Sequence, residues 1–104
     1  MKVVNLKKES YTHYIGRGSI FGNRFYIGKD GTREEVINKY EKWVQHYLYC
    51  WNYKLYGGHL QILSPLGQGI YDLPENAILG CYCKPLACHG DVIIKIWKEL
   101  HGNN

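Results

Sequence analysis

Apolar residues recur at helical spacing over two stretches of the chain. The first begins after Thr32, which suits a helix N-cap, and Glu35 at the third helical position would complete a capping box. One face stays apolar and aromatic to about residue 51, at Val36, Tyr40, Trp43, Val44, Tyr47 and Trp51. The spacing therefore predicts a long amphipathic helix that ends near residue 51.

The second helical stretch is DVIIKIWKELHG. Ile93, Ile96, Trp97 and Leu100 share one face of it, and Gly102 suits the C-cap. We expect a helix that begins close to Asp91.

Two short apolar runs predict strands. Residues 2–6, KVVNL, form the first run, and residues 77–83 form the second, which Pro85 ends because proline cannot donate to a strand ladder. Residues 60–63 read as a third, short strand; Gly57-Gly58 reads as a turn and residues 64–69 as a loop. Together these elements predict one α/β domain over residues 1–104. We expect a small sandwich with a mainly parallel, Rossmann-like sheet flanked by helices.

Residues 7–31 form a glycine-rich segment with little periodicity. Loops of this length in compact domains are often functional, and Gly16, Gly18 and Gly22 would let the backbone approach a ligand closely. The same segment carries side chains that can donate to phosphate or carboxylate: Arg17, Ser19, Asn23, Arg24 and Lys29. An irregular loop without a ligand is the alternative.

A cluster of chemically reactive residues lies between the second strand and the last helix. Cys88, His89, Gly90 and Asp91 fall in the turn before the helix, where free N–H groups favour anions and lower the pKa of a thiol. One interpretation is therefore an enzyme site, with Cys88 as nucleophile and His89 or Asp91 in support. A second is a binding site without chemistry, and a third is local capping and core packing.

Zinc is a further interpretation, because Cys81, Cys83, Cys88 and His89 are a suitable ligand set. In a regular strand, Cys81 and Cys83 would be about 6.6 Å apart along the chain. Two sulfurs on one zinc lie roughly 3.8 Å apart, so a sharp bend at Tyr82 would be needed. We therefore expect no cofactor and keep zinc as an alternative.

The amino-acid composition limits which kinds of binding partner we expect. The formal net charge is +4, and through Arg33 seven Lys/Arg stand against two Asp/Glu, which favours an anionic partner. The chain has ten tyrosines and three tryptophans, which suit the walls of a ligand site or a subunit interface. A homo-oligomer is therefore an alternative to a monomer. No signal peptide or membrane-length apolar run is present, so we expect a cytoplasmic protein with reduced cysteines and no membrane partner.

Four motifs resemble those of a small family of phages and bacteria, domain-of-unknown-function family 4326. They are VVNLKK, YIGRGSIFGN, DGTREEVINKYEKW and LGCYCKPLACHGDVII. The resemblance implies a compact α/β domain and a phage or bacterial source, hence the host cytoplasm if the chain is phage-encoded. It also implies that residues 52–76 are a family-specific insertion and that Arg24 stands where the family pattern has proline.

The leading functional prediction is that the protein binds a small anionic ligand, most simply a nucleotide. The ligand would lie between residues 14–31, which we call the Gly/Arg loop, and residues 88–91, which we call the CHGD turn. The expected ligand-binding residues are Arg17, Gly18, Ser19, Asn23, Arg24, Cys88, His89, Gly90 and Asp91. In a phage this would sequester a host signalling nucleotide. The alternatives are an enzyme that processes a nucleotide or nucleoside with Cys88, His89 and Asp91, and a Cys/His zinc module. Mild basicity alone does not lead us to expect nucleic acid as the partner.

Overall fold

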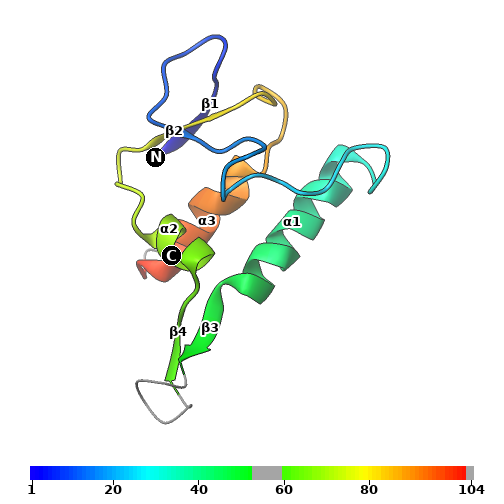
Figure 1. The fold of residues 1–104 in the computed structure, drawn as a ribbon. Coiled ribbons are helices and arrows are strands. Elements are labelled where there is room, and N and C mark those ends of the chain that lie inside the picture. The colour runs from blue at the N-terminus through cyan, green and yellow to red at the C-terminus, as the bar shows by residue number, and fades with distance from the viewer. Residues whose placement is uncertain (53–59, 103–104) are drawn as a thin grey trace.

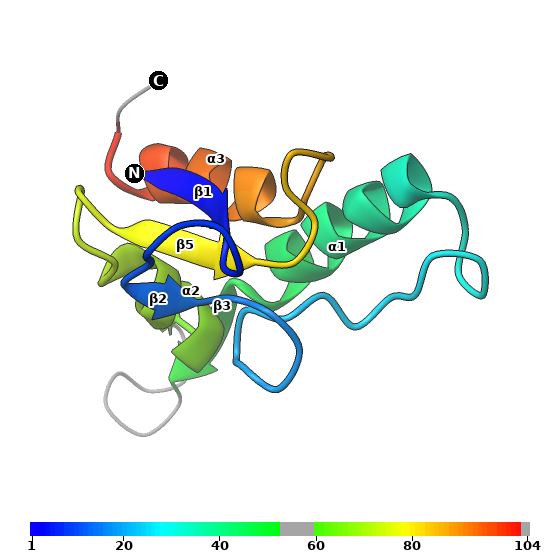
Figure 2. The same ribbon diagram turned by 90° about the horizontal axis from the view of Figure 1, so that it is seen from above.

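The computed structural model describes residues 1–52 and 60–102. It is a mixed α/β fold in which β1 (Lys2–Asn5), β5 (Ile78–Cys81) and β2 (His13–Tyr14) form a parallel three-stranded sheet in that order. Figure 1 shows the helices on one side of this sheet, and Figure 2 shows β5 between its two neighbours. The predicted parallel pairing of the first and last strands is confirmed. The Rossmann-like arrangement is not confirmed by this three-stranded sheet.

Helix α1 (Arg33–Tyr47) begins where the capping box predicted. The Thr32 hydroxyl accepts from the backbone N–H of Glu35 at 3.2 Å, and the Glu35 carboxylate accepts from the N–H of Thr32 at 3.0 Å. Its predicted end near residue 51 is wrong. The chain leaves the helix at Leu48, and β3 (Tyr49–Asn52) pairs antiparallel with β4 (Leu60–Leu63). Pairing with the next strand thus overrides a periodicity that would have continued the helix.

The middle of the chain holds a second difference. Strand β4 confirms the short strand predicted at residues 60–63, but the expected loop at 64–69 belongs to helix α2 (Pro65–Tyr71). Ser64 caps this helix by accepting from the N–H of Gly67 at 3.0 Å, and proline at the first position has no N–H to leave unpaired. The predicted Gly57-Gly58 turn lies outside the described residues. That residues 52–76 are an insertion stays a prediction.

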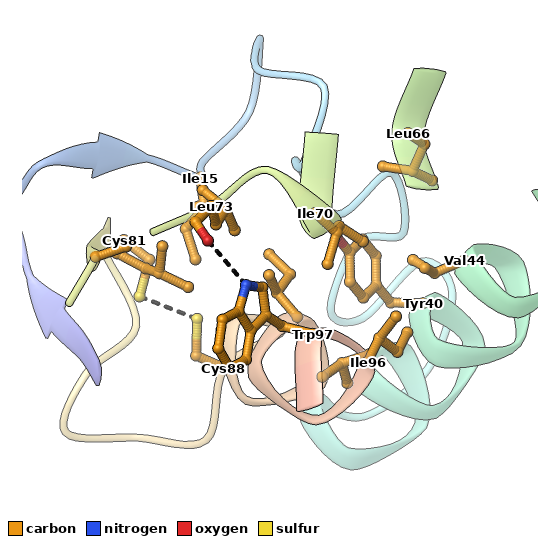
Figure 3. Close-up of a cluster of buried hydrophobic side chains, with 14 of the residues drawn as sticks. Ile15, Tyr40, Val44, Leu66, Ile70, Leu73, Cys81, Cys88, Ile96 and Trp97 are labelled. Atoms are coloured by element: carbon orange, nitrogen blue, oxygen red, sulfur yellow. Dashed lines mark hydrogen bonds between the residues drawn. The ribbon is translucent and has the colours of Figure 1, made fainter. Parts of the chain in front are cut away.

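Helix α3 (Gly90–Leu100) matches the predicted amphipathic stretch, and Gly102 after it has a left-handed φ of 72°. Its apolar face packs against α1, α2 and the sheet around a core that Figure 3 draws. Trp97 joins α3 to the segment between α2 and β5, since its indole N–H donates to the Leu73 carbonyl at 2.8 Å. No helix in the described part of the chain is long and apolar enough to cross a membrane.

The core also fixes the surroundings of the CHGD turn. Ile15, Leu79, Cys81 and Ile93 are completely buried, and they bring the ends of β2 and β5 against the start of α3. The parallel sheet therefore places the beginning of the Gly/Arg loop beside the last residues of β5.

Candidate functional site

A small pocket opens where the carboxyl end of β5, the turn before α3, the Gly/Arg loop and the start of α1 meet. Its volume is about 130 Å³. The walls are mostly apolar, and the polar side chains are those of two arginines, one asparagine, one histidine, one tyrosine and three cysteines. The lining residues include Arg17, Asn23, Arg33, Cys81, Cys83, Cys88 and His89.

Three thiols converge at the inner end of this pocket. The Sγ atoms of Cys81, Cys83 and Cys88 all lie within 4.8 Å of one another, and none of the three cysteines is in a disulfide. The convergence depends on a bend at Tyr82, which turns the chain directly after β5 and brings the Cys83 sulfur back toward that of Cys81. The three thiols are therefore close enough together to hold a metal ion.

Cys88 is held deeper than a reactive thiol would be. It is 2% exposed, and its sulfur lies 2.9 Å from that of Cys81, to which its thiol donates (Figure 3). Burial raises the pKa of the Cys88 thiol far above its ordinary value, and the hydrogen bond to Cys81 raises it further. Both effects favour the protonated thiol, which is a poor nucleophile.

His89 has a fixed orientation between the cluster and the loop. Its Nε2 lies 2.6 Å from the backbone oxygen of Ile15, and its Nδ1 lies 3.5 Å from Cys88 Sγ. Because a carbonyl can only accept, Nε2 carries the hydrogen and the neutral ring presents the lone pair of Nδ1 toward the sulfur. Burial lowers the pKa of His89, which favours this neutral form.

Arg17 lines the pocket and also holds its own loop in place. Its guanidinium donates to the carbonyls of Asn23 at 2.5 Å and Phe25 at 3.3 Å. It also lies over the ring of Tyr26. Within residues 1–52 and 60–102, no carboxylate forms an ion pair with Arg17, so these contacts leave its charge unneutralised.

Arg33 is a lining residue that the sequence reasoning missed. It is the first residue of α1, and its guanidinium donates at 3.2 Å to the carbonyl of Ala87, which also lines the pocket. No local pattern in the sequence indicated this role, because the contact joins two residues that are 54 positions apart.

The remaining predicted residues lie around the pocket rather than in it. Gly18, Ser19 and Arg24 line a shallow neighbouring hollow that shares Arg17 and Asn23 with the pocket. Asp91 is exposed and forms an ion pair with Lys84 at 3.1 Å.

The start of α3 offers few free donors to an anion. The N–H of Gly90 donates to Cys88 Sγ at 3.4 Å, and that of Asp91 donates to the Cys88 carbonyl at 3.1 Å. The N–H of Val92 donates to the carbonyl of His89 at 3.0 Å. An anion in the pocket would therefore be bound mainly by side chains, of which the two arginines carry the charge, and not by the start of α3.

Comparison with known proteins places these residues in a family. The family model described as Domain of unknown function (DUF4326) matches residues 2–99. The chain is also 34% identical over 100 residues to the "Uncharacterized 12.4 kDa protein in nrdA-td intergenic region" of Enterobacteria phage T4, over 95% of this chain and 79% of that protein. No solved structure matches the chain. The resemblance read from the four motifs is confirmed, and the chain belongs to domain-of-unknown-function family DUF4326.

Proposed function

We propose that this protein binds a phosphorylated small molecule, a nucleotide, with its phosphate in the pocket between Arg17 and Arg33. One observation carries the proposal: two arginines line an otherwise largely apolar pocket, and neither has a carboxylate partner among the described residues. Guanidinium groups bind phosphate through paired, charge-assisted hydrogen bonds. Arg17 and Arg33 keep donors free for such contacts, since each uses only part of its set of five on backbone carbonyls.

The size of the pocket limits which part of the ligand it can hold. The volume of the pocket is about 130 Å³. Pockets for whole small-molecule ligands are usually about 300 Å³ or more. We therefore place one phosphate inside and the rest of the ligand over the rim.

The rim offers an aromatic surface for that remainder. Tyr82 lines the pocket and is 58% exposed, and the exposed side chain of Ile27 also lines it. Stacking on an aromatic ring stabilises the binding of a nucleobase by about 1–3 kcal/mol, whichever base it is. A base on Tyr82 with its phosphate between the arginines is the arrangement we propose.

The phage relative suggests where such binding would matter. A phage protein of this kind would act in the cytoplasm of the infected cell and would withhold a host nucleotide by binding it. We do not propose catalysis by Cys88, because its buried thiol is strongly biased toward the protonated form.

Isothermal titration calorimetry tests the proposal. We expect nucleoside phosphates to bind and the matching nucleosides, which lack phosphate, to bind at least about tenfold more weakly. Arg33→Ala should weaken nucleotide binding, whereas Lys29→Ala, which removes a loop cation outside the pocket lining, should not. Equal affinity for nucleoside and nucleotide would exclude a phosphate site in this pocket.

A Cys/His zinc module is a second candidate function, favoured by the three sulfurs within 4.8 Å of one another. Zinc is a good match for a site made of thiolates and imidazole. Elemental analysis of the protein purified from cells without added metal tests this candidate, with one zinc per chain as the expected result.

A further inference from the structure

We propose that Cys81, Cys83 and Cys88 bind one zinc ion as thiolates and that Nδ1 of His89 is its fourth ligand. This inference rests on the zinc candidate above and is independent of nucleotide binding. It assigns a complete ligand set, and it gives the ion a structural task in the Gly/Arg loop.

The distances suit a tetrahedral site. With bonds of about 2.3 Å to sulfur and 2.1 Å to nitrogen, two sulfurs on one zinc lie about 3.8 Å apart, and a sulfur and a nitrogen about 3.6 Å apart. His89 Nδ1 lies 3.5 Å from Cys88 Sγ, close to the second value. The three sulfurs fall within 4.8 Å, and the pair Cys81–Cys88, at 2.9 Å, would separate by about 0.9 Å to admit the ion.

Nδ1 does not belong to the group of atoms within 4.8 Å, which consists of the three sulfurs alone in the described residues. Binding by all four ligands therefore requires Nδ1 and the sulfurs of Cys81 and Cys83 to approach one another. The sulfurs provide three ligands without this movement, and the histidine closes the site.

The other side of the His89 ring supports its role as a ligand. Nε2 donates to the Ile15 carbonyl at 2.6 Å, which leaves Nδ1 without a hydrogen and facing the thiol cluster. A metal-binding histidine commonly donates its second ring N–H to a backbone carbonyl, which fixes the tautomer and orients the ring.

Burial and charge also suit zinc. Cys81, Cys88 and His89 are all less than a tenth exposed. Three thiolates there would be very unfavourable without a cation, whereas zinc reduces their charge to a single net negative charge. Arg17 and Arg33 line the same pocket and outweigh that remaining charge. A phosphate between these two arginines is therefore compatible with the zinc site.

Such an ion would join the end of β5 to the turn before α3, and through His89 it would reach a third segment that is distant in the sequence. Cys81 ends β5, Cys88 precedes α3, and His89 reaches the backbone of Ile15 at the start of the Gly/Arg loop. Arg17 follows Ile15 by two residues. We infer that zinc holds the base of this loop and thereby positions Arg17.

X-ray absorption spectroscopy of the zinc-loaded wild-type protein tests the ligand set without any substitution. The expected first shell is three sulfurs and one nitrogen. Three sulfurs and one light atom without the outer-shell scattering of an imidazole ring would exclude His89 as a ligand. Two or fewer sulfurs, a protein that binds no zinc, or a Cys81–Cys88 disulfide in freshly purified protein would overturn the whole site.

Competition with a chromophoric zinc chelator then measures the contribution of each ligand. Cys83→Ser and His89→Ala should each weaken zinc binding by at least about 100-fold, since even residues that only support metal ligands contribute 10- to 100-fold. Cys50→Ser is the matched control, because Cys50 is an exposed cysteine in β3 and should leave the affinity unchanged.

The two proposals can fail separately. If His89→Ala binds zinc with wild-type affinity, the fourth ligand is wrong while the zinc candidate stands. If zinc binds as described but no nucleotide binds the zinc-loaded protein, the phosphate proposal fails and the metal site stands. Limited proteolysis of the Gly/Arg loop tests the structural task of the ion. Removal of zinc should speed cleavage of this loop in the wild-type protein, and it should speed cleavage to the same extent in Cys50→Ser.

Discussion

The guanidinium carbon of Arg17 lies 3.8 Å from the ring centroid of Tyr26. Tyr26 follows Phe25, whose carbonyl accepts a hydrogen bond from the same guanidinium, so residues 23–26 wrap around the Arg17 side chain. Arg17 therefore has two tasks, since it stabilises the loop and supplies a charge to the pocket.

Replacing Arg17 by alanine should affect both tasks. We expect nucleotide affinity to fall by about 1.5–3 kcal/mol, which is roughly 10- to 150-fold in Kd. Stability should fall by about 1 kcal/mol, because two backbone carbonyls lose an exposed donor. Arg17→Lys should recover part of the affinity, since lysine keeps the charge but not the planar fork. Calorimetry and thermal unfolding measure the two effects.

Arg24→Ala is the control for Arg17. Arg24 is exposed, lies 5.5 Å above the Trp43 ring and does not line the pocket. If Arg24→Ala weakened the ligand as much as Arg17→Ala, the ligand would sit in the shallow neighbouring hollow instead.

Thr32→Ala should destabilise the protein by about 1 kcal/mol, because the N–H of Glu35 loses its capping partner. For a domain of this size the melting temperature should fall by roughly 4–8 °C. Thr32→Ser keeps the hydroxyl and should retain most of the stability. An unchanged melting temperature for Thr32→Ala would mean that the cap contributes nothing measurable.

Glu35 should make stability depend on pH. Hydrogen bonds from the Thr32 backbone and side chain lower the pKa of Glu35 below its ordinary value of 4.5. Because the folded pKa is the lower one, the stabilisation is fully present above the unfolded value and is lost as pH falls through the folded value. The stability difference between wild type and Glu35→Gln should therefore shrink between about pH 5 and pH 3, as followed by urea unfolding. A difference that stays constant over this range would argue against an ionised capping carboxylate.

Gly90→Ala should destabilise the start of α3. A Cβ atom at this position would lie 2.7 Å from Cγ2 of Val3 and 2.9 Å from Cδ1 of Ile15. Such overpacking typically destabilises a protein by about 1–3 kcal/mol. Gly69→Ala is the matched helical control, since its Cβ would meet Phe21 at an ordinary 3.4 Å, and it should stabilise α2 by up to about 1 kcal/mol. Denaturant unfolding of both variants should show opposite signs.

Alkylation of the native protein should follow exposure rather than position beside a histidine. Cys50 is exposed and should react with iodoacetamide before the buried Cys81 and Cys88. Peptide mass spectrometry identifies the modified residues, and Cys50→Ser should remove the fast phase. Early labelling of Cys88 at neutral pH would instead support the enzyme interpretation.

Local chemistry in the sequence predicted the elements that it controls. Thr32 and Glu35 located the start of α1 because a capping box uses only neighbouring residues. The apolar spacing of α3 and its glycine cap were equally local. The end of α1 could not be predicted in this way, because residues 49–52 are extended through pairing with β4, which lies outside the helical stretch.

In the middle of the chain, glycines typical of a loop outweighed a helix-capping motif in the prediction. Ser64-Pro65 was a legitimate helix start, but Gly67 and Gly69 made the segment resemble a loop. Strand β2 has only two residues, too few for any periodicity to show. Its position is set by parallel pairing with Leu79 and Gly80.

For the candidate site, the sequence identified the residue types better than their arrangement. The thiol cluster, Arg17 and Asn23 do meet in one pocket. Asp91 lies elsewhere because Lys84 pairs with it, and Arg33 enters from α1 through a contact that no local pattern encodes. These positions depend on how separate segments pack, which spacing within one segment does not specify.

The register of β1 on β5 has a consequence for synthesis of the protein. Lys2 pairs with Ile78 and Asn5 with Cys81, so β1 leaves the ribosome long before the strand with which it pairs. Contacts between such distant residues form late and slow folding. Until residue 81 has emerged, the nascent chain exposes the edge of β1. The pocket is then incomplete, because Cys81 and the lining residues that follow it have not yet been placed. A ribosome stalled before that point should therefore carry a chain that can form α1 but cannot bind ligand.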